Sequence, residues 1–150
     1  SGGTVTSIKL AMASDHAGLT LKTIFADTPE SWGHEVVDLG THDEESVDYP
    51  DFADLLANCL ASGEVEWGVL ICGTGIGISI AANRHPHVRA AVCHDVTSAR
   101  LTRLHNNANV LALGERVIGT ETAKDCLKVF IETSFEGGRH QRRVDKLSPQ

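Results

Sequence analysis

Short apolar segments alternate with longer amphipathic segments along most of the chain, and this alternation restricts the fold more than any other feature. Val69-Leu70-Ile71 and Ala90-Ala91-Val92 are unbroken apolar runs, whereas the segments between such runs carry apolar residues at helical spacing. Unbroken apolar strands belong in parallel sheets that helices cover on both faces. The pattern predicts strands at 8–13, 35–39, 67–72, 88–93 and 108–113, each followed by a helix.

The expected architecture is therefore α/β, with a five-stranded parallel sheet between two helical layers in a Rossmann-like, three-layer α/β/α arrangement. We expect the strand order 2-1-3-4-5, in which the winding reverses between the first and third strands. Ligands bind beyond the carboxyl ends of the strands at such a reversal. After the last helix, expected at 120–133, Gly137-Gly138 is predicted to begin a basic tail.

The length of 150 residues indicates one domain over residues 8–150, preceded by a flexible tail over residues 1–7. The net charge of −7 disfavours nucleic acid or an anionic membrane as the main partner. No run of about eighteen apolar residues occurs, and the first residues lack the features of a signal peptide. We therefore expect a cytoplasmic protein without a transmembrane helix.

Metal-binding patterns are weak in this sequence. No C-x-x-C spacing occurs among the cysteines, which disfavours a zinc site; they are Cys59, Cys72, Cys93 and Cys126. Disulfides are disfavoured in a cytoplasmic α/β protein. The segment His85-Pro86-His87 could bind a metal, but it lacks a third ligand, and a solvated loop is the simpler interpretation. We expect no metal site.

Three alternating glycines, Gly73, Gly75 and Gly77, join the third strand to its helix. Such a loop directs backbone N–H groups at one point and places the positive end of a helix dipole there, which favours an anion. The segment lacks the G-K-[ST] of a phosphate-binding P-loop, the spacing of a dinucleotide fingerprint and the second glycine of a nucleophile elbow. A tight turn without a ligand is the alternative, although three glycines cost conformational entropy without adding packing.

Cys72 ends the third strand beside this loop, where the same field favours a thiolate over a thiol. We interpret it as a catalytic nucleophile or base; an inert buried thiol is the alternative. Thr74 either caps the following helix or assists catalysis, and the two roles are compatible.

Asp15 and His16 follow the first strand. With the expected strand order, they meet Cys72 at the reversal of winding, which favours one shared site. A purely structural role for Asp15 as a helix cap is the alternative.

Two polar segments in the second half of the chain remain. His105-Asn106-Asn107 ends the fourth predicted helix, where a histidine could also serve only the helix dipole. The segment 137–143 carries the densest positive charge in an acidic protein, and its arginines, Arg139, Arg142 and Arg143, match the geometry of phosphate. Together with the glycine loop, these arginines indicate a phosphorylated small molecule as ligand.

Five segments together resemble the ribose-5-phosphate isomerase B family, which includes allose- and galactose-6-phosphate isomerases. They are Ser14–Gly18, Asp48-Tyr49-Pro50, Gly68–Asn83, His105-Asn106-Asn107 and Gly137-Gly138-Arg139-His140, and the resemblance extends from about residue 8 to residue 147. It implies the five-stranded fold described above, and a homodimer, or a tetramer of dimers, whose active sites are shared between subunits.

The resemblance also implies roles for individual residues in an aldose–ketose isomerisation through an enediolate, without metal or other cofactor. Cys72 matches the catalytic base, Thr74 the residue that assists at the sugar oxygens, and Asp15 a carboxylate that orients the substrate. His105 of the neighbouring subunit matches the residue that opens the sugar ring. One branch of the family carries glutamate at the position of Ile78, so here the cysteine must act as base.

The remaining matches concern substrate binding. The enediolate would be held by N–H groups of Gly73, Gly75 and Gly77, and the phosphate by His16, Arg139 and Arg143, with Arg116 linked to phosphate contact in some members. Tyr49 would line the site, and Asn106 would accompany His105. The resemblance departs at Ala13-Ser14, where other members often have glycine and cysteine.

The function expected from residues and resemblance together is the interconversion of ribose 5-phosphate and ribulose 5-phosphate. Two alternatives stay open. The same chemistry could act on another sugar phosphate, a tetrose phosphate or allose or galactose 6-phosphate, or the chain could be a non-catalytic partner subunit that binds a sugar phosphate.

Overall fold

The computed structural model of the protein describes residues 6–147. Five parallel strands form one sheet: β1 (Lys9–Ser14), β2 (Glu35–Asp38), β3 (Trp67–Cys72), β4 (Ala90–Val92) and β5 (Val110–Gly114). Of the predicted N-terminal tail, residues 1–5 lie outside the described part, and Ser7 donates a hydrogen bond from Oγ to the carbonyl of Gly33 at 2.8 Å.

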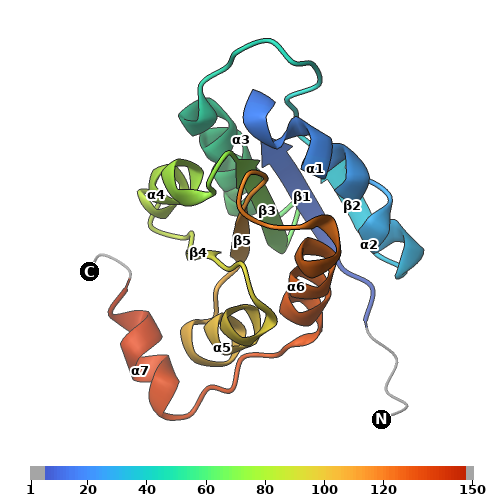
Figure 1. The fold of residues 1–150 in the computed structure, drawn as a ribbon. Helices are drawn as coiled ribbons and strands as arrows, with labels where there is room; N and C mark the ends of the chain where they lie inside the picture. Colours follow the sequence, from blue (N-terminus) through green and yellow to red (C-terminus); the bar gives the residue numbers. More distant parts are fainter. Residues whose placement is uncertain (1–5, 148–150) are drawn as a thin grey trace.

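Helices cover both faces of this sheet, as the sequence predicts (Figure 1). They are a 3-10 turn, η1 (His16–Gly18), and the helices α1 (Leu19–Phe25), α2 (Thr28–Ser31), α3 (Tyr49–Ala61), α4 (Ile76–Asn83), α5 (Val96–Asn106), α6 (Thr120–Glu132) and α7 (Arg139–Asp145). Apolar residues of α1, α5 and α6 pack on one face of the sheet, and those of α3 and α4 pack on the other. The three-layer α/β/α architecture is confirmed.

The strand order is β2-β1-β3-β5-β4, so the predicted order 2-1-3-4-5 is wrong at its last two positions. All five residues of β5 are buried, and it pairs with β3 from Val110 to Gly114. β4 has only three residues, all half-buried, and it pairs with β5 alone. The fully apolar strand therefore takes the interior position and the short strand forms the edge. The reversal between β1 and β3, which places the site, is as predicted.

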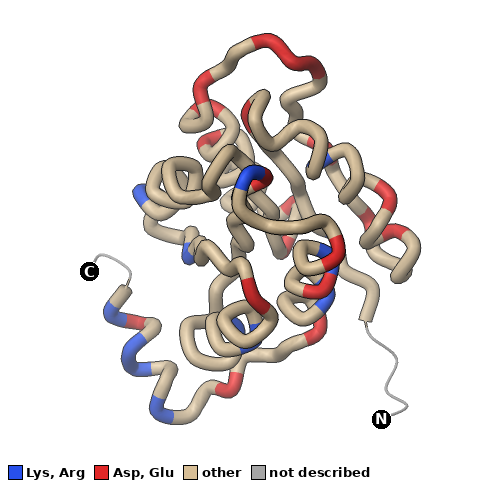
Figure 2. The backbone as a smooth tube through the Cα atoms, viewed as in Figure 1, with Lys and Arg blue, Asp and Glu red and all other residues tan. Residues whose placement is uncertain are grey.

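The segment after Gly137-Gly138 is not a tail but the helix α7, which packs on α5. His140 and Val144 are four residues apart and form its buried face, while its arginines point outward. Figure 2 shows this positive helix and the acidic loop before α3 at opposite ends of the molecule. The single helix predicted after the first strand is divided into η1, α1 and α2.

No helix within residues 6–147 is both long enough and apolar enough to cross a membrane.

Candidate active site

The loop after β3 is held in one conformation by close backbone packing. Gly75 has φ +77°, and a Cβ atom there would lie 2.8 Å from the carbonyl carbon of Leu113. Across the same contact, a Cβ on Gly114 would lie 2.4 Å from the carbonyl carbon of Thr74. Only glycine fits at these two positions, because the space for a Cβ is already filled at both and Gly75 also has a positive φ that L side chains rarely adopt. The loop between β3 and α4 therefore rests directly on the end of β5.

Cys72 lies at the start of this loop with its sulfur aimed at the backbone of the next turn. The N–H of Gly75 donates a hydrogen bond to Cys72 Sγ at 3.2 Å, and the side chain is 5% exposed. α4 begins at Ile76, so the sulfur also faces the positive end of a helix. A thiolate makes both interactions more strongly than a thiol, which suits a base or nucleophile.

Asp15 and His16 lie at the carboxyl end of β1, the neighbour of β3 in the sheet. Asp15 Oδ1 accepts hydrogen bonds from the N–H groups of Ala17 and Gly18, at 3.0 and 3.2 Å, and so has the capping role that was the alternative reading. Nδ1 of His16 accepts from the N–H of Val47 at 3.1 Å, which leaves the ring proton of the neutral imidazole on Nε2. His16 can therefore donate a hydrogen bond to a ligand.

These clusters share one cavity of about 440 Å³, as the reversal of winding predicts. We call it the cysteine cavity, and its lining residues are Asp15, His16, Ala17, Tyr49, Cys72, Gly73, Thr74, Ile76, Gly77 and Arg116. The ring of Tyr49 lies against Gly77, where a Cβ would come within 2.7 Å of it, and the guanidinium of Arg116 lies over Gly73. Absence of side chains on these two glycines lets a tyrosine and an arginine approach the loop.

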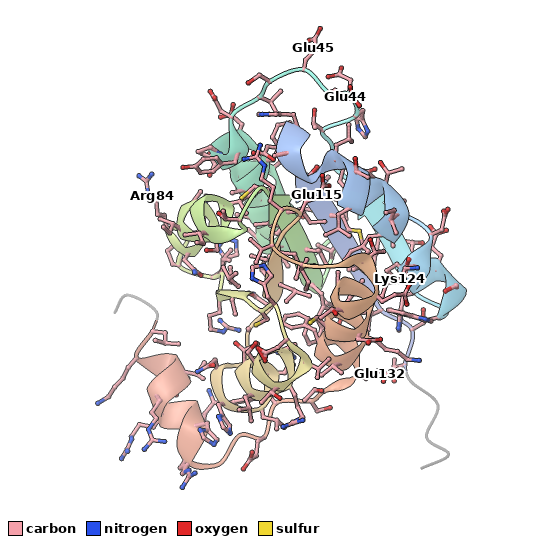
Figure 3. All side chains as sticks on the ribbon, viewed as in Figure 1. Glu44, Glu45, Arg84, Glu115, Lys124 and Glu132 are labelled. Carbon is pink, nitrogen blue, oxygen red and sulfur yellow. The ribbon has the colours of Figure 1, made fainter. Side chains whose placement is uncertain are left out.

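The polar groups around the loop are oriented by backbone hydrogen bonds. Arg116 donates its N–H to the carbonyl of Gly73, and Glu115 donates its N–H to that of Cys72, both at 3.0 Å. The side chain of Glu115, labelled in Figure 3, reaches α1 and accepts the N–H of Leu21 at 2.6 Å. Thr74 Oγ1 accepts from the N–H of Ile76 at 3.2 Å, a local turn contact, but the N-cap of α4 is Gly75 and the predicted capping role of Thr74 is wrong.

His105, Asn106 and Arg143 do not join this cavity. They lie between the end of α5 and α7 in a second cavity of about 290 Å³, the His105 cavity, lined by His105, Asn106, His140, Arg143, Val144 and Leu147. Arg139 is exposed at the start of α7 and lines neither cavity. In Figure 1, α7 is well separated from η1 and from the loop after β3. The predicted residues therefore form two groups within one chain.

His140 also belongs to the second group, although the sequence predicts no role for it. It is 6% exposed, and its ring stacks on that of His105 with centroids 4.4 Å apart and planes 19° apart. Burial, and then the neighbouring His105, lowers the pKa of His140. Its spacing of four from Val144 is the signal that could have identified it as the inner face of a helix.

Comparisons with known proteins agree over nearly the whole chain. The sequence model of the Ribose/Galactose Isomerase family matches residues 10–147. Ribose-5-phosphate isomerase B of Escherichia coli (strain K12) is 47% identical over 140 residues, which cover 93% of this chain and 94% of that protein. The putative sugar phosphate isomerase YwlF of Bacillus subtilis (strain 168) is 46% identical over 142 residues, covering 94% of this chain and 95% of that protein.

The fold has close counterparts among solved structures. The structure of ribose-5-phosphate isomerase B from Clostridium thermocellum matches with a TM-score of 0.92 and 51% identity, covering 93% of this chain and 95% of that chain. That of a ribose 5-phosphate isomerase from Thermotoga maritima matches with a TM-score of 0.93 and 48% identity, covering 95% of this chain and 99% of that chain.

Proposed function

The chain belongs to the Ribose/Galactose Isomerase family, and on that premise we propose that it interconverts ribose 5-phosphate and ribulose 5-phosphate with Cys72 as the base. The observation that carries the proposal is the placement of Cys72 Sγ. It accepts the N–H of Gly75 at 3.2 Å and lines the same cavity as Asp15 and His16.

The chemistry requires one proton to move between two carbons. The Cys72 thiolate takes the proton from C2 of the open-chain aldose, the C–H electrons form the C1–C2 double bond, and the carbonyl electrons move to O1. The resulting enediolate is held by N–H groups of the loop from Gly73 to Gly77, and Thr74 assists the transfer of the O2 proton to O1. As the O2–H electrons form the C2 carbonyl, Cys72 returns the carbon-bound proton to C1, which gives the ketose and restores the thiolate. Preorganised donors matter here, since removing one typically costs ~10²–10³ in rate.

The phosphate would be held at the other end of the sugar. In the cysteine cavity, His16 offers its Nε2–H and Arg116 offers a guanidinium beside Gly73. Arg139 and Arg143 of a second subunit complete the phosphate contacts. Binding energy from this non-reacting group holds the sugar in the geometry of the transition state.

A homodimer with shared sites accounts for the separation of the two residue groups. Ile76 and Ile80 lie four residues apart on α4 and are 55% and 61% exposed, an apolar stripe beside the mouth of the cysteine cavity. A second copy that covers this stripe can bring its His105, Asn106 and arginines to Cys72 and open the sugar ring there. Two such dimers could associate further. We place the enzyme in the cytoplasm, which agrees with four free cysteines within residues 6–147.

A different sugar phosphate is the second candidate, because the family name joins ribose and galactose isomerases. Comparing kcat/KM for tetrose, pentose and hexose phosphates tests it. The proposal expects the pentose phosphate to give the highest value, and a higher value for another chain length would contradict it. Measurable binding of every sugar phosphate with no turnover would instead favour a non-catalytic partner subunit.

The base assignment is tested with Cys72→Ala, measured beside Cys59→Ala, which removes a buried thiol from α3. Loss of the base should lower kcat by roughly 10²–10⁴. The Cys59 variant should keep its turnover. If folded Cys72→Ala turns over near the rate of the unmodified chain, Cys72 is not the base.

A further inference from the structure

Three side chains of metal-ligating type converge where α5, α7 and the segment between α6 and α7 meet. They are His105, Glu136 and His140, and one potential ligand atom from each lies within 4.8 Å of the others. They come from positions up to 35 residues apart, so no local spacing in the sequence predicts the cluster.

The backbone around this cluster is tied together by hydrogen bonds. The N–H of Glu136 donates to the carbonyl of Leu104 at 3.1 Å, and this fixes the Glu136 backbone next to His105. The N–H of His140 donates to the carbonyl of Gly137 at 3.0 Å in the first turn of α7. The carboxylate of Glu136 remains exposed.

One nitrogen in the cluster has no partner. Nε2 of His140 is buried, and it makes no hydrogen bond with any of the described residues, while the whole side chain is 6% exposed. A buried polar atom without a partner typically costs about 1–3 kcal/mol, so such atoms are rare in folded proteins and often mark the place of an unseen ion or water.

We propose that His105, Glu136 and His140 bind a divalent transition-metal ion of the zinc type. Two imidazoles and a carboxylate are a donor set that zinc uses when a fourth position stays open. Magnesium and calcium prefer oxygen ligands throughout, so a site with two nitrogen donors disfavours them. Because Nε2 of His140 makes no hydrogen bond with the described residues, no hydrogen bond has to break before this nitrogen binds the metal.

The present geometry needs only side-chain movement to reach coordination. Ligand atoms of a tetrahedral site with bonds of about 2.1 Å lie about 3.4 Å apart. The stacked rings of His105 and His140 must turn out of parallel for their nitrogens to converge. His140 is held by burial, so the half-buried His105 and the exposed Glu136 make the movement.

Occupation of the site would also stop turnover, a consequence that rests on the proposed function. His105 is the residue assigned to opening the sugar ring, and a bound metal holds the imidazole away from the substrate. Zinc bound to one chain then excludes catalysis at the shared site that uses the His105 of that chain.

The test measures metal binding directly in the 150-residue chain without an affinity tag. Zinc binding is followed by calorimetry, and cobalt is used as the spectroscopic probe. Glu136→Gln removes one ligand from the surface, and Glu132→Gln removes a nearby exposed carboxylate of α6, labelled in Figure 3, as the matched control. His85→Gln removes half of the other histidine pair, whose ring centroids are 6.0 Å apart.

We expect one zinc per chain, weakened by more than roughly tenfold in Glu136→Gln, since loss of even an outer-sphere partner costs about 10–100-fold. The Glu132 and His85 variants should bind as tightly as the unmodified chain. Cobalt should show the visible bands of a nitrogen and oxygen site without sulfur charge transfer.

Any of three results would overturn the proposal: no binding, unchanged affinity in Glu136→Gln, or a sulfur-to-cobalt band that Cys72→Ala removes. Binding in the Cys72→Ala background separates this site from the proposed function. If Cys72→Ala keeps its turnover yet binds zinc through Glu136, only the base assignment fails.

Discussion

The cysteine cavity and the His105 cavity differ in how the fold supports them. The first lies over the middle of the sheet, where the loop after β3 rests on the end of β5, and the side chains of Asp15, His16 and Cys72 accept backbone hydrogen bonds. The second lies at the periphery, on a helix of seven residues that packs on α5. Arg139 and Arg143 on that helix are exposed and are absent from the four ion pairs found among residues 6–147.

The difference indicates a division of roles. Reaction at the carbon atoms needs donors that are fixed before the substrate arrives, and the centre of the sheet supplies them. On the proposed function, the groups that bind phosphate and open the ring can lie on a peripheral element. On the proposed function, a site split in this way is incomplete in one chain and needs a second copy.

Gly75→Ala is expected to have the largest effect on the cysteine cavity, because it disturbs the fixed loop after β3. The Cβ would meet the carbonyl of Leu113 at 2.8 Å, so the loop must move and the N–H to Cys72 is lost. We expect kcat to fall by ~10²–10³, as for removal of one fixed donor.

Gly63→Ala is the matched control, because Gly63 has φ +79° with nothing near its Cβ position. It should lose about 1–2 kcal/mol in free energy of unfolding from the positive φ alone, with kcat unchanged. Equal effects of Gly75→Ala and Gly63→Ala on kcat would show that the packing of the loop after β3 does not determine the rate.

The need for a second copy is tested by Ile80→Asp on the exposed face of α4. A buried, unpaired charge in a subunit interface typically costs several kcal/mol, so the variant should be monomeric in sedimentation and almost inactive. The monomer should stay folded, because Ile80 is exposed on the single chain. Ile24→Asp, on α1 at the opposite face of the sheet, should stay dimeric. A fully active monomer would remove the case for a shared site.

A smaller effect is the pH dependence of the free energy of unfolding, to which a buried histidine contributes in each region. The N–H of Gly114 donates to Nε2 of His94 at 2.9 Å, and burial, partly opposed by Asp95, lowers the pKa of His94. Because the unfolded histidine, with a pKa of about 6.5, takes up its proton first, this contribution is complete above that pH and is lost as pH falls. The lowered pKa of His140 acts in the same direction.

Urea unfolding at about pH 7.5 and about pH 5.5 checks this dependence. His94→Gln keeps an acceptor for Gly114 and does not titrate, so the acid-induced loss of stability should shrink. His140→Gln, near the His105 cavity, should also reduce the acid-induced loss of stability. His42→Gln, at the exposed surface, should leave that loss unchanged. If neither His94→Gln nor His140→Gln alters the pH dependence, the two buried histidines are not its source.

The sequence predicted best what depends on local pattern and on the centre of the sheet. Apolar runs located all five strands, and the reversal between β1 and β3 brought Asp15 to Cys72. Strand order beyond β3 was missed, because β4 and β5 are both apolar and only pairing over five residues gives β5 the interior place.

The periphery was harder to predict for a different physical reason. The segment from Arg139 to Asp145 is rich in arginine, so its sequence resembles a solvated tail. The only sign of a helix is the spacing of four between His140 and Val144, the two residues that α7 buries. The contact between His105 and His140 depends on how α7 packs on α5, and no spacing along the chain records that packing.

The most direct test of the account combines two inactive variants, Cys72→Ala and His105→Asn, by unfolding and refolding them together. If each site takes Cys72 from one subunit and His105 from the other, half of the dimers are mixed and each holds one intact site, so activity should return to about a quarter of that of the unmodified chain. No recovery from a mixture that has formed mixed dimers would contradict the shared site.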